Sequence, residues 1–178
     1  MTKDILIIDG YNVIFAWTYF KKLAHHNLEH ARIELRNQLL NYGKYKGFEV
    51  ILVFDGLING NFGSSEYITK GFLEIYTAEG ETADSYIERE VYSRKGKYTN
   101  VYVVTSDGAE QNQILGSGGL RVPARELQNN IRLAKEEERR QYTHNHYRDD
   151  MRIRRNELGD LLDPKVAAQL EEIRRGIK

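Results

Sequence analysis

The stretch Ile5-Leu6-Ile7-Ile8-Asp9-Gly10-Tyr11-Asn12 decides the fold of this chain. Four consecutive apolar residues that end in a turn are typical of a strand buried on both faces, as strands in a parallel sheet are. Asp9 places a carboxylate at the carboxyl end of this strand, where parallel sheets bind their ligands. The stretch therefore predicts an α/β protein with an acidic group at the functional edge of its sheet.

The same pattern of an apolar run followed by aspartate and glycine occurs twice more. Residues 50–54 are apolar and precede Asp55-Gly56, and the strand-like residues 101–106 precede Asp107-Gly108. Because the carboxyl ends of parallel strands meet at one edge, the three acids are expected to lie close together. This arrangement predicts a carboxylate-lined metal site.

The segments between these strands read as alternating helices and strands. A helix is predicted over residues 28–46 and ends at Gly47, and a second helix runs from Thr82 to about residue 95. Further strands are predicted over residues 49–55, 71–77, 100–106 and 120–122, with a glycine-rich loop over 56–65 and a short helix over 109–115. This alternation favours a parallel sheet with helices on both faces.

The C-terminal third has a different character. Residues 124–155 contain neither glycine nor proline, and the apolar stripe Leu127, Ile131 and Ala134 fades after its first turns. We therefore expect a domain over residues 1–127 and a charged C-terminal helical extension over 128–178. Three arginines repeat every seven residues and are candidates for substrate or partner binding: Arg125, Arg132 and Arg139. A solvated helix laced with ion pairs is an equally good interpretation of these charges.

Composition narrows the class of protein. The chain has 178 residues, no cysteine and a formal net charge of zero. Disulfides and a thiolate nucleophile are therefore excluded. No apolar run is long enough to span a membrane, and no GxxxxGK[ST] loop is present, so neither a membrane partner nor a nucleotide cofactor is expected. The expected location is cytoplasmic.

A fourth acid, Asp84, lies in Glu81-Thr82-Ala83-Asp84 at the start of the second predicted helix. Each acid has an ordinary structural interpretation, since aspartate favours helix starts and turns. Carboxylates gathered at one edge, however, repel each other unless a cation neutralises them, and Mg²⁺ or Mn²⁺ prefers such oxygen ligands. Bound ions of this kind activate water and stabilise charge on a phosphate, which suits phosphodiester hydrolysis.

Neighbouring polar and aromatic residues are secondary candidates. The Asn12 amide can hold a metal-bound water or a phosphate oxygen, or it can bond its own backbone in a turn. Ser106, just before Asp107, can position phosphate or simply end the strand. Tyr11, Phe15 and Trp17 can stack on bases of a single strand, although at least two of them are expected in the core.

These motifs together resemble the NYN domains, a branch of the PIN-like ribonucleases. The resemblance rests on residues 8–12, 53–56, 81–84 and 105–107, and the closer match is the YacP-type group of bacterial NYN proteins. It implies a PIN-like three-layer α/β/α sandwich with a mostly parallel central sheet and a long charged C-terminal helix. It also implies an endoribonuclease that depends on Mg²⁺ or Mn²⁺.

Residue by residue, the resemblance assigns Asp9, Asp84 and Asp107 to metal binding and Asn12 to the motif asparagine, with Asp55 as a recurrent further acid. The YacP-type group includes an endoribonuclease that cleaves messenger RNA in the A site of the translating ribosome. RNA, specifically mRNA, and the ribosome are therefore the expected partners. The neutral charge agrees with this expectation, because free RNA binding depends on an excess of basic side chains.

Three alternatives stay open. The first is a non-catalytic RNA- or ribosome-binding module on the same fold. The four acids argue against it, because a protein that only binds RNA has no reason to place carboxylates opposite phosphates. The second is a phosphotransfer or receiver-type domain, which usually has paired acids after its first strand. The third is a DNA nuclease with the same metal chemistry, which only contacts to the 2′-hydroxyl would distinguish.

Overall fold

A six-stranded sheet forms the centre of the molecule, in the order β3-β4-β2-β1-β5-β6. We describe it from a computed structural model, which covers residues 3–58, 60, 62–94, 96–105, 119–160 and 175, with side chains in the last helix as far as residue 143. The strands are β1 (Ile5–Asp9), β2 (Glu49–Phe54), β3 (Ser65–Thr69), β4 (Phe72–Tyr76), β5 (Val101–Thr105) and β6 (Leu120–Pro123). All neighbouring strands pair in parallel except β3, which pairs antiparallel with β4. The predicted mostly parallel sheet is confirmed.

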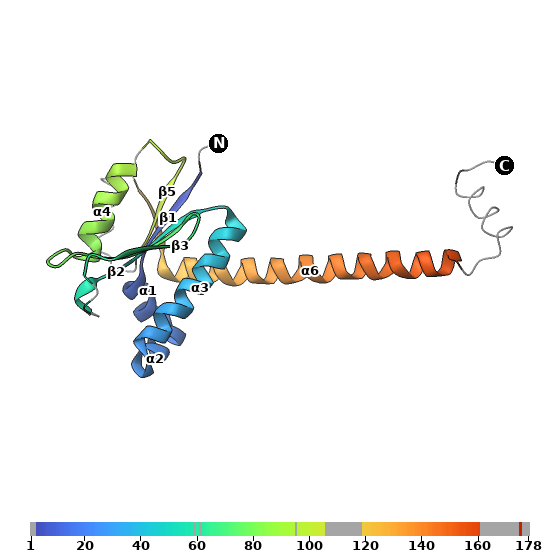
Figure 1. Ribbon diagram of the computed structural model, residues 1–178, viewed down its shortest axis with the longest axis horizontal. Helices are drawn as coiled ribbons and strands as arrows, with labels where there is room; N and C mark the ends of the chain where they lie inside the picture. The colour runs from blue at the N-terminus through green and yellow to red at the C-terminus, as the bar shows by residue number, and fades with distance from the viewer. Residues whose placement is uncertain are drawn as a thin grey trace. The chain divides into compact units, whose positions relative to one another are not determined.

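Helices cover both faces of this sheet, as the α/β/α prediction requires. The helices are α1 (Gly10–Ala16), α2 (Thr18–His26), α3 (Leu28–Lys46), α4 (Ala83–Arg94) and α6 (Ala124–Asp160), with a short 3₁₀ helix η1 (Gly56–Ile58). In Figure 1, α1, α2 and α3 lie on one side of the sheet and α4 lies on the other. Helix α3 ends at Gly47, whose φ of 73° is a left-handed conformation that glycine adopts without strain.

Three elements differ from the sequence-based expectation. Helices α1 and α2 were not predicted, because α1 begins directly at the end of β1 and Asp9 is both the last residue of the strand and the N-cap of the helix. Strand β3 was not predicted either, because its residues are exposed or half-buried and show no apolar alternation. The short helix expected over residues 109–115 and the last helix expected after Asp163 lie outside the described residues.

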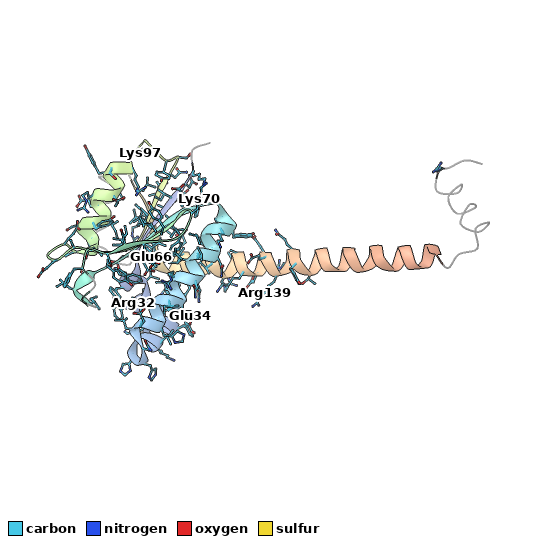
Figure 2. All side chains as sticks on the ribbon, viewed as in Figure 1. Arg32, Glu34, Glu66, Lys70, Lys97 and Arg139 are labelled. Atoms are coloured by element: carbon cyan, nitrogen blue, oxygen red, sulfur yellow. The ribbon has the colours of Figure 1, made fainter. Side chains whose placement is uncertain are left out.

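Both edges of the sheet carry charged side chains, and the amino edge carries both signs, as the ion pair between Lys3 and Glu49 shows. Lys70 lies in the turn that precedes β4, and Lys97 lies in the turn that precedes β5, so both lysines belong to the amino edge. Figure 2 shows them on the same side of the molecule. Asp9 and Asp55, in contrast, lie at the carboxyl ends of β1 and β2. Asp9 and Asp55 therefore lie at the edge that the sequence predicts.

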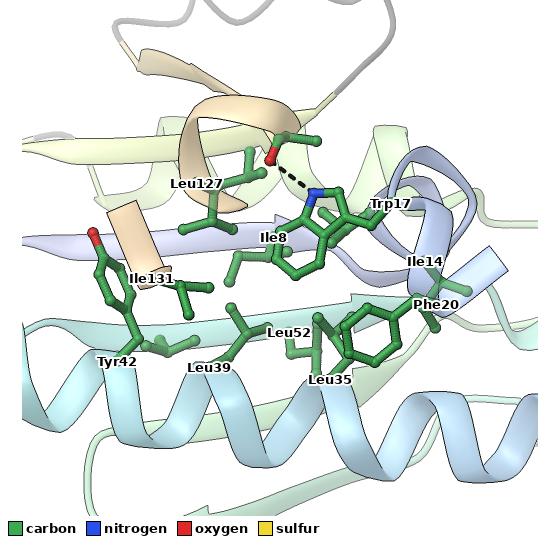
Figure 3. Close-up of a cluster of buried hydrophobic side chains, with 14 of the residues drawn as sticks. Ile8, Ile14, Trp17, Phe20, Leu35, Leu39, Tyr42, Leu52, Leu127 and Ile131 are labelled. Carbon is green, nitrogen blue, oxygen red and sulfur yellow. Dashed lines mark hydrogen bonds between the residues drawn. The ribbon is translucent and has the colours of Figure 1, made fainter. Parts of the chain in front are cut away.

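The core has two parts, one on each face of the sheet. Between the sheet and helices α1, α2, α3 and the first turns of α6, a large cluster includes Ile8, Trp17, Leu35, Leu39 and Leu127 (Figure 3). A smaller cluster joins the other face to α4 and contains these residues: Ile5, Ile7, Ile51, Val53, Ile75, Ala83, Ile87, Val91, Val101 and Val103. The predicted stripe on α6 is confirmed, since Leu127, Ile131 and Ala134 are all buried.

The chain divides into two compact units, Met1–Ala134 and Lys135–Lys178. The sheet and all helices before α6 belong to the first unit. The described part of the second unit is the remainder of α6, whose residues Glu137 to Thr143 are exposed. The predicted domain boundary after residue 127 stays a prediction.

Gly10 is required by a close approach between α1 and β2. A Cβ atom at this position would overlap the ring of Phe54, which is fully buried. We expect Gly10→Ala to lower the free energy of unfolding by about 1–3 kcal/mol, as overpacking of a closed core does. Urea unfolding followed by circular dichroism measures this change.

A double-mutant cycle supplies the control for this prediction. Phe54→Leu removes the ring atoms that a Cβ atom would meet, so Gly10→Ala should cost much less in the Phe54→Leu background. Equal costs in both backgrounds would contradict the steric explanation.

Candidate functional site

Two carboxylates lie side by side at the carboxyl edge because their strands are neighbours. Asp9 ends β1 and pairs in register with Val53 of β2, and Asp55 follows two residues after Val53. Strand β5 lies on the other side of β1 and ends at Thr105, which is buried. The chain leaves β1 toward β2 and later returns on the opposite side to form β5, so β1 lies at a topological switch point, where open α/β sheets bind ligands.

The pleat of the strands sets the face on which these acids lie. Ile5, Ile7, Ile51 and Val53 all pack in the cluster on the α4 side. Since side chains alternate along a strand, Asp9 at the end of β1 continues this alternation toward α4, and Asp55 lies one residue beyond the end of β2. Helix α4 begins at this edge with Asp84 in its first turn. Three acids therefore share one edge of the sheet, Asp9 on β1, Asp55 just after β2 and Asp84 on α4.

Asp9 is the most buried of these acids, with an exposed fraction of 7%. Its Oδ1 accepts a hydrogen bond of 2.9 Å from the backbone N–H of Asn12, which caps α1. Burial, together with the negative charges of Asp84 and Asp55, raises the pKa of Asp9 from 3.8 to about 6, although the Asn12 N–H opposes this shift. The charges of Asp55 and Asp84 thus act on Asp9, and a cation beside Asp9 would relieve this repulsion.

Asp55 is held by the turn that follows β2. Its Oδ1 accepts a hydrogen bond of 2.9 Å from the backbone N–H of Leu57. The backbone N–H of Gly56 donates to Oγ1 of the buried Thr77, at 3.0 Å, at the carboxyl end of β4. Thr77 was not singled out from the sequence, because a threonine after an apolar strand is ordinary and carries no distinct signal.

Arg32 fixes the start of α1 from the opposite face and was also missed. It lies on α3 (Figure 2), is buried, and donates from Nη1 to the Tyr11 hydroxyl at 2.9 Å. It also forms an ion pair with Glu29, and its guanidinium carbon lies 5.7 Å from the centroid of the Tyr76 ring. Tyr11 lies between Asp9 and Asn12, so this contact helps to fix the backbone that carries both. An arginine within a helical pattern gives no sequence signal for such a role.

Of the three aromatic residues considered for base stacking, two lie in the core, as the sequence analysis expects. Tyr11 and Trp17 are buried, whereas Phe15 is half-exposed. Asn12 is half-buried beside Asp9. Arg125 and Arg132 are exposed on α6 in the first unit, and Arg132 donates to the Asn129 side chain at 2.9 Å. Arg139 (Figure 2) is exposed in the second unit.

Two predicted site residues, Ser106 and Asp107, lie outside the described residues. Within the ranges that the structure describes, no group of three or more histidine, aspartate or glutamate side chains is arranged to hold a metal ion. The donor chemistry nevertheless fits a hard divalent ion, because Asp9, Asp55 and Asp84 offer carboxylate oxygens and the charges of Asp55 and Asp84 act on Asp9.

The fold and the acidic edge define the class of the protein: a mixed α/β protein with a mostly parallel sheet and a PIN-like arrangement of helices on both faces. The model of the YacP-like NYN domain family matches residues 6–175. The chain therefore belongs to the YacP-like NYN domain family, which has a nuclease-type fold.

Relatives from Bacillus subtilis support this assignment. The chain is 41% identical over 125 residues to "Uncharacterized protein YacP" of strain 168, covering 70% of this chain and 72% of that protein. The crystal structure of Rae1 (YacP) from the same organism matches with a TM-score of 0.67 and 34% identity, covering 97% of this chain and 95% of that one. A point variant of Rae1 matches with a TM-score of 0.66 and 37% identity over 77% and 79% of the two chains.

No helix in the described part of the chain is both long and apolar enough to cross a membrane. This finding agrees with the absence of a long apolar run in the sequence.

Proposed function

We propose that this protein is a divalent-metal-dependent endoribonuclease that cleaves mRNA in association with the translating ribosome. The observation that carries the proposal is the placement of three carboxylates, Asp9, Asp55 and Asp84, at the carboxyl edge of the sheet, where Asp55 and Asp84 both act electrostatically on Asp9. The membership of the YacP-like NYN domain family, with its nuclease-type fold, supports it.

The proposed roles combine the positions of the described acids with the roles that the family resemblance implies. Asp9, Asp84 and Asp107 would hold Mg²⁺ or Mn²⁺, with Asp55 as a further ligand. The ion, when bound, would activate water and stabilise negative charge on the scissile phosphate. Asn12 would orient a phosphate oxygen or a water beside Asp9, and Ser106 would contribute to substrate binding.

Partner binding is proposed to involve the exposed arginines of α6. The chain has a net charge of zero, so free RNA would be attracted only weakly. A ribosome would supply most of the docking surface and present the mRNA, while Arg125, Arg132 and Arg139 would contact phosphates. This proposal includes a cytoplasmic location.

The test is RNA cleavage in a translating extract with and without active ribosomes. Asp84→Asn should lower the cleavage rate on the order of 100-fold or more, because loss of a supporting residue around a metal already costs 10- to 100-fold. Glu88→Gln removes the same charge one turn further along α4 and should leave the rate unchanged. Asp84 is exposed, so Asp84→Asn is expected to fold.

The outcomes separate the candidate functions. Cleavage that depends on Asp84 and on translation supports the full proposal, whereas Asp84-dependent cleavage of free RNA removes the ribosome requirement. The absence of cleavage in both settings would favour the non-catalytic binding module. One observation favours this alternative: among the described residues, no group of three or more acidic or histidine side chains is arranged to hold a metal ion.

A further inference from the structure

A cavity of about 270 Å³ lies between α3 and the first turns of α6, over β1, β5 and β6. Leu6 of β1 belongs to its lining and packs in the large core cluster, on the face of the sheet opposite α4. Leu6 precedes Asp9 by three residues, roughly 10 Å along the strand. The cavity is therefore separate from the acidic edge, and its whole lining belongs to the first compact unit. We call it the α3–α6 cavity.

Aromatic rings form much of the wall of the α3–α6 cavity. The Phe48 ring contacts those of Tyr42 on α3 and Tyr102 on β5, with centroids 6.2 Å and 5.7 Å away. These two ring pairs are inclined by 70° and 39°. Val122 of β6 and Leu127 of α6 add aliphatic surface. Such a lining favours a flat ring as ligand, because aromatic side chains attract other rings in stacked and edge-on arrangements.

The hydroxyl of Tyr42 is a polar group of this lining that the protein leaves unpaired. Tyr42 has an exposed fraction of only 7%, and its hydroxyl has no hydrogen-bond partner within the part of the chain that the structure describes. In Figure 3 the hydroxyl points away from α3. Burial and the negative charge of Glu126 raise the pKa of Tyr42, so the phenol stays protonated and can donate a hydrogen bond.

Polar side chains from both helices complete the lining. Lys46 and Glu126 are exposed, and Asn130 is half-buried. Lys46 follows Tyr42 by four residues on α3, and Asn130 follows Glu126 by four residues on α6, so each pair shares one side of its helix. The opposite charges of Lys46 and Glu126 cancel, so the cavity does not favour a charged ligand. The Asn130 amide can both donate and accept hydrogen bonds.

We propose that the α3–α6 cavity binds a small, uncharged heteroaromatic ring with a hydrogen-bond acceptor at its edge, as in a free purine base or nucleoside. The Tyr42 hydroxyl donates to the acceptor, and the rings of Phe48 and Tyr102 contact the ligand ring. The cavity is smaller than the roughly 300–1,000 Å³ of sites for drug-sized molecules, which suits a single ring system. A phosphate on the ligand would gain nothing from a lining whose charges cancel.

The test is saturation-transfer NMR of the full-length protein titrated with adenine. We expect a Kd below about 1 mM, which about ten non-hydrogen atoms can supply. Tyr42→Phe removes only the hydroxyl and should weaken adenine binding about three- to tenfold, as the loss of one hydrogen bond does. Asn130→Trp adds a large ring to the lining and should abolish binding. Circular dichroism shows whether each variant is folded.

Matched variants outside the lining supply the controls. Asn129→Trp introduces the same ring at an exposed position of α6 beside the cavity, and should leave adenine binding unchanged. Tyr92→Phe removes a hydroxyl from α4, where Tyr92 has an exposed fraction of 74%, and should also have no effect. Indole is flat but has no acceptor nitrogen, so it should bind about threefold more weakly than adenine or worse and should not respond to Tyr42→Phe.

Three results would overturn the proposal. The first is no adenine binding at about 1 mM, and the second is equal binding by the wild type and Tyr42→Phe. The third is tighter binding of adenosine monophosphate or an oligoadenylate than of adenine, which would indicate phosphate or RNA recognition instead. Asp84→Asn should bind adenine as the wild type does, because Asp84 lies at the acidic edge. This inference therefore stands or fails independently of the nuclease function.

Discussion

Asp9→Asn is expected to abolish RNA cleavage and, at pH 8, to raise the free energy of unfolding. Activity should fall on the order of 100-fold or more, because the change removes the most buried of the proposed metal ligands. The fold should persist, because asparagine caps a helix as well as aspartate does and can still accept the Asn12 N–H.

The stability gain follows from the raised pKa of Asp9. The pKa is 3.8 in its ordinary environment and about 6 in the folded protein. The folded state therefore binds the proton more tightly than the unfolded state, and stability falls as pH rises from about 4 to about 6. Above that range the ionised group destabilises the fold by an amount of order ~3 kcal/mol, since each pKa unit corresponds to about 1.4 kcal/mol.

Urea unfolding at pH 3.5 and pH 8 measures the effect. Asp9→Asn should be more stable than the wild type by about 1–3 kcal/mol at pH 8 and nearly equal to it at pH 3.5, where the wild-type group is mostly protonated in both states. Mn²⁺ should stabilise the wild type and not the variant. An equal gain at both pH values would contradict the electrostatic explanation, and retained cleavage would contradict the role of Asp9.

Apolar runs explain why much of the sheet was predictable. Ile5 to Ile8, Val50 to Phe54 and Val101 to Val104 each carry a local pattern that holds regardless of the rest of the chain. Their order also predicts the edge at which the acids meet. The face of the sheet toward which Asp9 points was not predictable from the sequence. It depends on which face α4 covers, and the packing of Ile87 and Val91 against the sheet determines that face.

Long-range contacts explain the elements that the sequence did not reveal. The break between α1 and α2 falls at Trp17, whose backbone is extended, with φ of −93° and ψ of 122°. No glycine or proline marks it. No sequence pattern indicates the role of Arg32 either, because that role arises only when α3 packs beside Tyr11. In both cases the structural role belongs to a contact between distant parts of the chain.

Trp17→Ala is expected to cause the largest loss of stability. The indole is buried, its ring centroid lies 5.6 Å from that of Phe20, and its Nε1 donates a hydrogen bond of 2.8 Å to the carbonyl of Ala124 (Figure 3). This bond joins the α1–α2 junction to the first residue of α6. Truncation leaves a large cavity and removes this hydrogen bond, so the free energy of unfolding should fall by about 3–5 kcal/mol.

Trp17→Phe separates packing from hydrogen bonding. Phenylalanine fills most of the space but cannot donate to Ala124, so it should cost about 0.5–1.5 kcal/mol, the net contribution of a typical hydrogen bond. Tyr92→Ala, at an exposed site, should change stability by no more than about 0.5 kcal/mol. If Trp17→Phe were as stable as the wild type in urea unfolding, ring packing alone would join the start of α6 to the α1–α2 junction.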